Sequence, residues 1–161
     1  MHKLDDEWFV SLALEQADEA YRQNEVPVGA VLVDESGKIL SKSFNIKETN
    51  HNPCGHAEIL VIQQAARELS SWRLVGCTLY VTLEPCPMCL SACVQARIGR
   101  LVFGAYDKKG GALSLGYKLF KDSRLNHQFP VVGGVKHFDC SRILSRFFKE
   151  KRTFYSGKAI P

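Results

Sequence analysis

Two short motifs carry side chains whose types and spacing suit chemistry. Residues 56–58 read His-Ala-Glu, and residues 85–89 read Pro-Cys-Pro-Met-Cys. Because Cys86 and Cys89 are three positions apart, both sulfurs would face one side of a helix start, where free amides and the helix dipole stabilise thiolates. Such a pair suits a soft divalent metal, most commonly zinc. A Cys-x-x-Cys motif between a strand and a helix is equally typical of dithiol redox sites, so this motif alone leaves both open.

The histidine and the glutamate favour zinc over redox chemistry. His56 supplies a third ligand beside Cys86 and Cys89, and three protein ligands leave the fourth position of a catalytic zinc site for water. Glu58 is then the predicted catalytic residue, a carboxylate that carries protons without binding the metal. A redox dithiol needs neither residue. If Cys54 were a fourth ligand, the site would be closed and structural, and this alternative remains open.

The predicted site places one geometric demand on the chain. Side chains at positions i and i+2 of a regular helix point in different directions, so His56 and Glu58 cannot share a site within a helix. His56 must therefore lie at the very N-terminus, where the dihedral angles are not yet helical. The loop residues 53–55, Pro-Cys-Gly, are compatible with a helix that starts there.

The hydrophobic pattern predicts strands that alternate with helices. Apolar residues recur at helical spacing in four segments and form strand-like runs in five others. The expected helices cover 5–22, 56–69, 88–96 and about 139–152, and the expected strands cover 26–33, 38–44, 77–83, 100–106 and 130–135. This order predicts a single α/β domain over residues 1–161, a three-layer α/β/α sandwich around a central mixed sheet of about five strands.

Composition and charge bound the class of protein. The chain has 161 residues, of which 45% are hydrophobic and 24% charged, which are ordinary globular values. No apolar run is long enough for a membrane helix, and acids stand near the start where a signal peptide would be apolar, which predicts a cytoplasmic protein without membrane contact. Residues 136–161 hold seven Lys or Arg against two acids, a basic end suited either to a polyanion or to a solvated helix face.

Further motifs extend over most of the chain. They are residues 25–31 (Glu-Val-Pro-Val-Gly-Ala-Val), 82–86 (Thr-Leu-Glu-Pro-Cys), 97–100, 102–105, Asp107 with Lys109 and Gly111-Ala112, 126–127 (Asn-His), and Phe147-Phe148 with Lys151-Arg152. With the His-x-Glu and Pro-Cys-x-x-Cys motifs, they make the sequence resemble the tRNA adenosine deaminases of the cytidine-deaminase-like superfamily.

That resemblance implies a fold, a reaction and a set of site residues. It implies a cytidine-deaminase-like fold, one Zn²⁺ on the three predicted ligands, and a homodimer that converts the wobble adenosine of an arginine tRNA to inosine. Asn45 matches a residue that contacts the target nucleoside, and Asp107 matches a loop that meets the anticodon stem-loop. The C-terminal helix would border the RNA through Phe147, Phe148 and Arg152.

The sequence departs from the family pattern at two places. Cys54-Gly55 precede the zinc histidine where Thr-Ala is more usual, and Ser114-Leu115-Gly116 replace Gly-Ser-Leu. The first could alter the rim of the metal site and the second the fit of RNA. Three other readings remain: a deaminase of free bases or nucleotides, a non-catalytic RNA-binding protein with structural zinc, and a dithiol redox protein.

Overall fold

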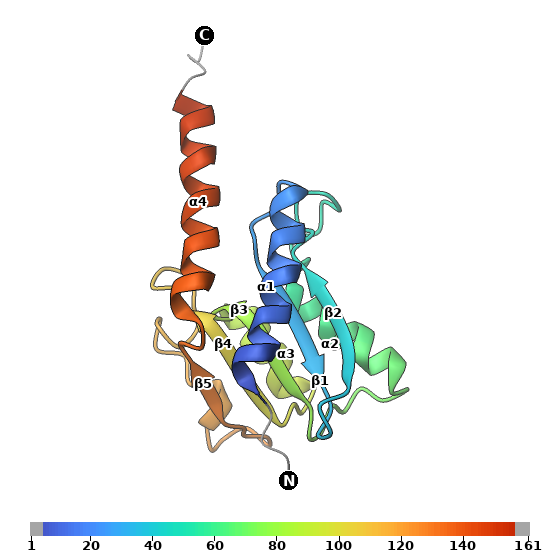
Figure 1. The fold of residues 1–161 in the computed structure, drawn as a ribbon. Helices are drawn as coiled ribbons and strands as arrows, with labels where there is room; N and C mark the ends of the chain where they lie inside the picture. The colour runs from blue at the N-terminus through green and yellow to red at the C-terminus, as the bar shows by residue number, and fades with distance from the viewer. Residues whose placement is uncertain (1–4, 157–161) are drawn as a thin grey trace.

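The computed structural model describes residues 5–156, with side chains described up to residue 154. Five strands and four α-helices alternate along the chain (Figure 1). In chain order they are α1 (Asp6–Arg22), β1 (Gly29–Val33), β2 (Ile39–Phe44), α2 (Ala57–Glu68), β3 (Thr78–Leu83), α3 (Pro87–Gln95), β4 (Arg100–Ala105), the short 3₁₀ helix η1 (Leu119–Lys121), β5 (Val131–Gly133) and α4 (His137–Ser156).

The strands form one mixed sheet in the order β2-β1-β3-β4-β5. Strand β1 pairs antiparallel with β2 and β3, whereas β3, β4 and β5 run parallel. The carboxyl ends of β3 and β4 and the beginning of β1 therefore share one edge of the sheet. In sheets of this kind, ligands bind beyond the carboxyl ends of the parallel strands.

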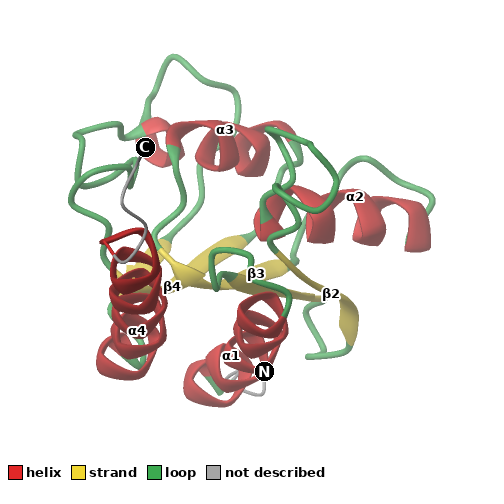
Figure 2. Ribbon diagram, turned by 90° about the horizontal axis from the view of Figure 1, so that it is seen from above, coloured by secondary structure: helices red, strands yellow, loops and turns green. Residues whose placement is uncertain are grey.

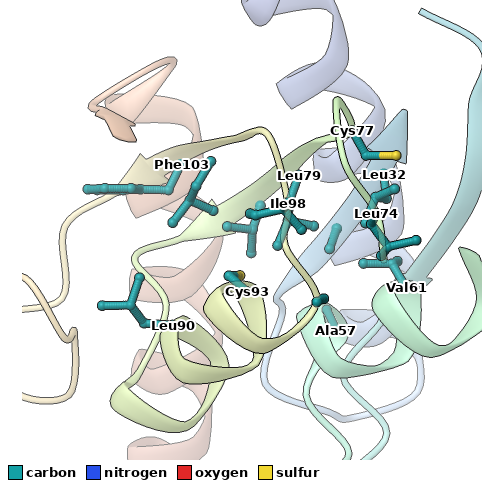
Figure 3. Close-up of a cluster of buried hydrophobic side chains, with 14 of the residues drawn as sticks. Leu32, Ala57, Val61, Leu74, Cys77, Leu79, Leu90, Cys93, Ile98 and Phe103 are labelled. Carbon is teal, nitrogen blue, oxygen red and sulfur yellow. The ribbon is translucent and has the colours of Figure 1, made fainter. Parts of the chain in front are cut away.

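Helices cover both faces of the sheet. Figure 2 shows α2 and α3 on one face and α1 and α4 on the other. Alternate residues of the central strands feed two cores: Leu79 and Val81 pack towards α2 and α3, whereas Tyr80 packs towards α1 and α4. The first core also contains Cys77 and Cys93 (Figure 3). The predicted three-layer α/β/α sandwich with a mixed five-stranded sheet is confirmed.

Helix α1 is tied to the sheet by a polar cluster at its first turn. The Asp5 carboxylate accepts the Trp8 amide at 3.0 Å and caps the helix. The next residue, Asp6, receives two hydrogen bonds from the Arg100 guanidinium at 2.6 and 2.7 Å and one from the Tyr80 hydroxyl at 3.0 Å. This cluster fixes α1 across β3 and β4.

The last helix differs from its predicted bounds of about 139–152. Helix α4 starts at His137 and runs to Ser156, and its far end projects beyond the sheet (Figure 1). The apolar residues Cys140, Ile143, Leu144, Phe147 and Phe148 recur at helical spacing, which predicts that they share one face. Cys140 is buried against the sheet, but Phe148 is 44% exposed. The pattern failed there because the sheet no longer lies beneath that part of the helix. Within residues 5–156, no helix combines the length and hydrophobicity that crossing a bilayer takes.

Candidate active site

The three predicted metal ligands come together beyond the carboxyl end of β3. The ligand atoms of His56, Cys86 and Cys89 all lie within 4.8 Å of one another. The His56 Nδ1 atom lies 3.7 Å from the Cys86 sulfur and 3.5 Å from the Cys89 sulfur. Within the described part of the chain, this is the one group of three or more His, Cys, Asp or Glu side chains that converge in this way.

These spacings fit zinc. In a tetrahedral site with Zn–N bonds of about 2.1 Å and Zn–S bonds of about 2.3 Å, a nitrogen and a sulfur ligand lie about 3.6 Å apart. The observed 3.5 and 3.7 Å bracket that value. One nitrogen and two sulfurs are also a donor set that zinc prefers, and three protein ligands leave one coordination position for water.

Both motifs lie at helix starts, as the site requires. His56 is the N-cap of α2, with extended dihedral angles of φ −82° and ψ 144°. Cys86 is the N-cap of α3, at φ −70° and ψ 169°, and Pro87 follows at the first helical position, where no amide donor is needed. The prediction that His56 lies outside the regular helix is confirmed, and this resolves the geometric conflict with Glu58.

Hydrogen bonds among the three ligand side chains shift their pKa values. A hydrogen bond with Cys89 and another with His56 lower the pKa of Cys86 to about 4, against the opposing effect of burial. The hydrogen bond with Cys86 raises the pKa of His56. The hydrogen bond between Cys89 and Cys86, together with burial, raises the pKa of the Cys89 thiol. Without metal, Cys86 is thus the thiolate of the pair, so one sulfur is already in the ionised form that metals bind.

Glu58 lies one residue inside α2 and is only 4% exposed. Burial raises the pKa of its carboxyl group, while the nearby His56 and a hydrogen bond with Cys89 lower it. A carboxylate that burial makes more basic, next to the metal cluster but outside it, suits a group that accepts and returns a proton.

The other cysteines are not part of the converging group. Cys54 is exposed, whereas Cys77, Cys93 and Cys140 are buried, as expected for core residues. A Cβ atom added at Gly104 would lie 2.3 Å from the Cys140 sulfur, so this thiol fills the space that a larger residue at position 104 would need. The structure therefore places no fourth sulfur on the three-ligand cluster within the described residues.

Asn45 lies close to the zinc histidine. It is buried at 7% exposure, and its side-chain oxygen accepts the amide of Ala57 at 3.2 Å. The Ala57 amide belongs to the first turn of α2, directly after His56. Asn45 therefore links the loop after β2 to the residue that directly follows the metal ligand His56.

A groove opens at the same edge of the sheet. It has a volume of about 710 Å³ and begins at Leu83 and Ala105, the last residues of β3 and β4. Asp107, Phe148 and Arg152 all line it, so three of the predicted substrate residues come together. The other lining residues are Val26, Tyr106, Lys108, Lys109, Ser141, Leu144 and Ser145.

Phe147 points elsewhere. It is 6% exposed, and its ring packs edge-on against Tyr21 of α1 with the centroids 5.6 Å apart. Arg146 also lies over the Tyr21 ring, 4.3 Å from its centroid. Phe147 therefore joins α4 to α1, whereas its neighbour Phe148 faces the groove.

Three residues were given no role from the sequence, and two of them belong to the groove. Tyr106 and Lys108 line the groove beside Asp107, and their position next to a predicted contact residue was the available signal. His127, noted only as part of a motif, lies 2.7 Å from the Ile98 carbonyl oxygen through Nε2 and stacks on Phe129. These contacts give His127 a place in the packing of the loop before β5.

Comparison with known proteins agrees with this geometry. Residues 3–105 match the family model described as the cytidine and deoxycytidylate deaminase zinc-binding region. The sandwich and the His, Cys, Cys cluster thus define a zinc-dependent deaminase. A tRNA-specific adenosine deaminase from Bacillus subtilis is 47% identical over 147 residues, or 91% of each chain, and one from Haemophilus influenzae is 44% identical over 91% of this chain and 85% of that protein.

A solved structure is similar to this chain in both fold and sequence. The structure comes from a study of A-to-I editing by tRNA:A34 deaminases at the wobble position of transfer RNA. It superposes with a TM-score of 0.80 at 42% identity, covering 85% of this chain and 99% of that chain. A guanine deaminase from Nitrosomonas europaea, at 20% identity and a TM-score of 0.75, shares the fold. The chain belongs to the tRNA-specific adenosine deaminases of the cytidine and deoxycytidylate deaminase family.

Proposed function

We propose that this protein hydrolyses the wobble adenosine of a tRNA anticodon to inosine, with release of ammonia. The proposal rests chiefly on the groove, which is lined by aromatic and basic side chains and begins at the carboxyl ends of β3 and β4, the edge of the sheet beyond which the predicted zinc ligands converge. Leu83, which lines the groove, precedes Cys86 by three positions in the chain. RNA loops are recognised by such a combination of aromatic stacking and phosphate contacts.

Zinc would be held by His56, Cys86 and Cys89, and when bound it supplies a Lewis acid that lowers the pKa of water to about 7. Glu58 moves the protons. Its carboxylate accepts a proton from the attacking water as the bond to the ring carbon C6 forms, and delivers that proton to the ring nitrogen N1. The Glu58 carboxylate then takes the remaining proton from the hydroxyl group added at C6, and as the bond from C6 to the exocyclic nitrogen breaks, it gives this proton to the departing amino group, which leaves as ammonia. The burial of Glu58 keeps bulk water from competing for these protons.

Each of the predicted substrate-binding residues has a different role. The side-chain amide of Asn45, fixed by its bond to Ala57, contacts the target nucleoside next to the metal. Asp107 shapes the groove loop, because its carboxylate accepts the amides of Lys109 at 3.0 Å and Gly110 at 3.1 Å. Phe148 stacks on a base of the anticodon loop and Arg152 contacts a phosphate. Phe147 acts indirectly by anchoring α4 to α1.

A deaminase of free nucleobases would use the same zinc cluster and the same glutamate. It would have no use for Phe148 and Arg152 on a helix that extends beyond the sheet (Figure 1). The test is competition: an anticodon stem-loop with a wobble adenosine is incubated beside free adenosine, cytidine and guanine. Inosine formed in the stem-loop alone supports the proposal, and turnover of a free base instead refutes it.

Three further parts of the proposal concern the setting of the reaction. We infer that the protein forms a homodimer. Leu115 and Tyr117, in the loop that follows the groove residues, are both half-exposed, and such an apolar surface supports contact with a second copy. Sedimentation velocity tests this inference, and a monomer would contradict it.

An arginine tRNA is the expected substrate, which editing of individual tRNA transcripts would test. Because mature tRNAs serve translation, the expected compartment is the cytoplasm, and fractionation would test it.

A further inference from the structure

Glu84 is a buried charge that the proposed chemistry does not use. It is 2% exposed and lies between the last residue of β3 and the Pro85-Cys86 turn. Its Oε1 atom accepts the amide of Ser114 at 2.7 Å, and its Oε2 atom accepts the amide of Asp107 at 3.0 Å and the hydroxyl of Ser114 at 2.6 Å. A buried carboxylate with three donors is a strong and directional anchor.

The donors belong to the two ends of one loop. Asp107 belongs to the segment after β4 that lines the groove, and Ser114 lies seven positions further on. Between them, the amide of Ala112 donates to the carbonyl oxygen of Pro85 at 2.8 Å. The loop is thus held at three points by two adjacent residues, Glu84 and Pro85, which directly precede the zinc ligand Cys86.

The loop is also shaped to make room for this carboxylate. A Cβ atom at Gly111 would lie 2.3 Å from the Glu84 carboxyl carbon and 2.5 and 2.6 Å from its two oxygens. Since real Cβ contacts do not approach so closely, only glycine fits at position 111 while Glu84 keeps its place. The Ser114 hydroxyl, at one of the positions where this sequence departs from the family pattern, supplies one of the three donors.

We propose that Glu84 is a positioning residue that holds the loop 107–114 in register with the zinc-binding turn and thereby sets the RNA-contacting wall of the groove. Glu84 acts through the main chain of Asp107 and Ser114 and touches neither metal nor substrate. The inference rests on the proposed function, because the consequence it predicts for binding concerns an anticodon stem-loop.

The test variant is Glu84→Gln. The amide offers one acceptor oxygen, and its NH₂ group must face the N–H of either Asp107 or Ser114, so one main-chain donor loses its acceptor whichever way the side chain turns. We expect the stem-loop to bind about tenfold more weakly, with KM raised by about the same factor and kcat nearly unchanged. Zinc content should stay at the wild-type level.

The chain contains a matched control at the opposite edge of the sheet. The Asp34 carboxylate accepts the amides of Ser36 and Lys38 at 2.9 and 3.0 Å and the Ser36 hydroxyl at 2.7 Å, in the turn between β1 and β2. All three donors share the Oδ1 atom, which Asp34→Asn would keep as an amide oxygen, so Asp34→Ala is the variant that removes this anchor far from the groove. It should loosen its own turn and leave RNA affinity, KM and zinc content unchanged.

Amide hydrogen exchange separates positioning from general loss of stability. In Glu84→Gln, exchange should accelerate at Asp107, Gly111 and Ser114 and stay unchanged in α1 and β1. Gly111→Ala, which keeps the charge of Glu84 but displaces it, should reproduce both the exchange pattern and the weaker RNA binding.

Three outcomes would overturn the inference: unchanged exchange in the loop, unchanged RNA affinity despite faster exchange, or loss of zinc from Glu84→Gln. If the wild-type protein binds no stem-loop, the proposed function fails, and loop exchange alone then decides whether Glu84 positions the loop.

Discussion

Phe147 and Phe148 are neighbours in sequence, but replacement by alanine should lower the stability of the protein at Phe147 and its affinity for RNA at Phe148. Phe147 is 6% exposed and packs on Tyr21, with the Lys151 ammonium 5.4 Å from its ring centre. Removing a buried Phe side chain costs about 3–5 kcal/mol. Because Phe147 lies where one helix crosses another at the edge of the core, we expect about 3 kcal/mol, which lowers Tm by about 6–12 °C for a chain of this size.

Phe148→Ala should spare stability and weaken RNA binding. Phe148 is 44% exposed and lines the groove, so its loss creates no buried cavity. Base stacking on an aromatic side chain contributes about 1–3 kcal/mol, so affinity for the stem-loop should fall by roughly five- to 150-fold. Thermal unfolding and fluorescence anisotropy with a labelled stem-loop measure the two effects separately.

Phe138 provides the control, because it is on the same helix, 86% exposed and outside the groove lining. Phe138→Ala should change neither Tm nor RNA affinity. Equal losses of RNA affinity in the Phe147 and Phe148 variants without a fall in Tm for Phe147→Ala would refute the assignment of the two rings.

Other substitutions probe the metal site. Glu58→Gln should keep zinc and the fold but lower kcat by about 10²–10⁴-fold. Single-turnover formation of inosine measures this loss, and wild-type rates would exclude Glu58 as the proton carrier. Cys89→Ser should reduce bound zinc measured by atomic emission, whereas Cys54→Ser should retain it because Cys54 is exposed and outside the cluster; loss of zinc from Cys54→Ser would point to a closed site. In metal-free protein, Cys86 should be alkylated at neutral pH and progressively less as the pH falls through about 4, since its lowered pKa keeps it ionised above that value. Zinc should block this alkylation, and equal alkylation with and without zinc would contradict the ligand assignment.

The sequence was most informative where local chemistry decides the structure. Cys86 is followed by proline and begins a helix, and His56 is preceded by a Pro-Cys-Gly loop, so both helix starts could be predicted within one or two residues. The order of strands and helices likewise predicted the α/β/α sandwich around one sheet. These features depend on neighbours in the chain, which a sequence pattern records directly.

Features that depend on distant segments were predicted less well. The apolar stripe of the last helix placed Phe148 with Cys140, but where the sheet ends beneath α4 is a property of the tertiary structure. The carboxylate of Glu84 reaches Ser114 across 30 positions of sequence, so no local pattern could identify it as the anchor of the groove loop. The groove itself combines side chains from the strand ends, the loop after β4 and α4.

The proposed reaction is the editing of a wobble adenosine in tRNA by this protein. The most direct measurement is sequencing of a full-length tRNA transcript after incubation with the zinc-loaded protein, with Glu58→Gln as the paired control. We expect conversion of the wobble adenosine to inosine, read as guanosine, at that one position and only with the unaltered protein. An unchanged adenosine, or equal conversion with Glu58→Gln, would contradict it.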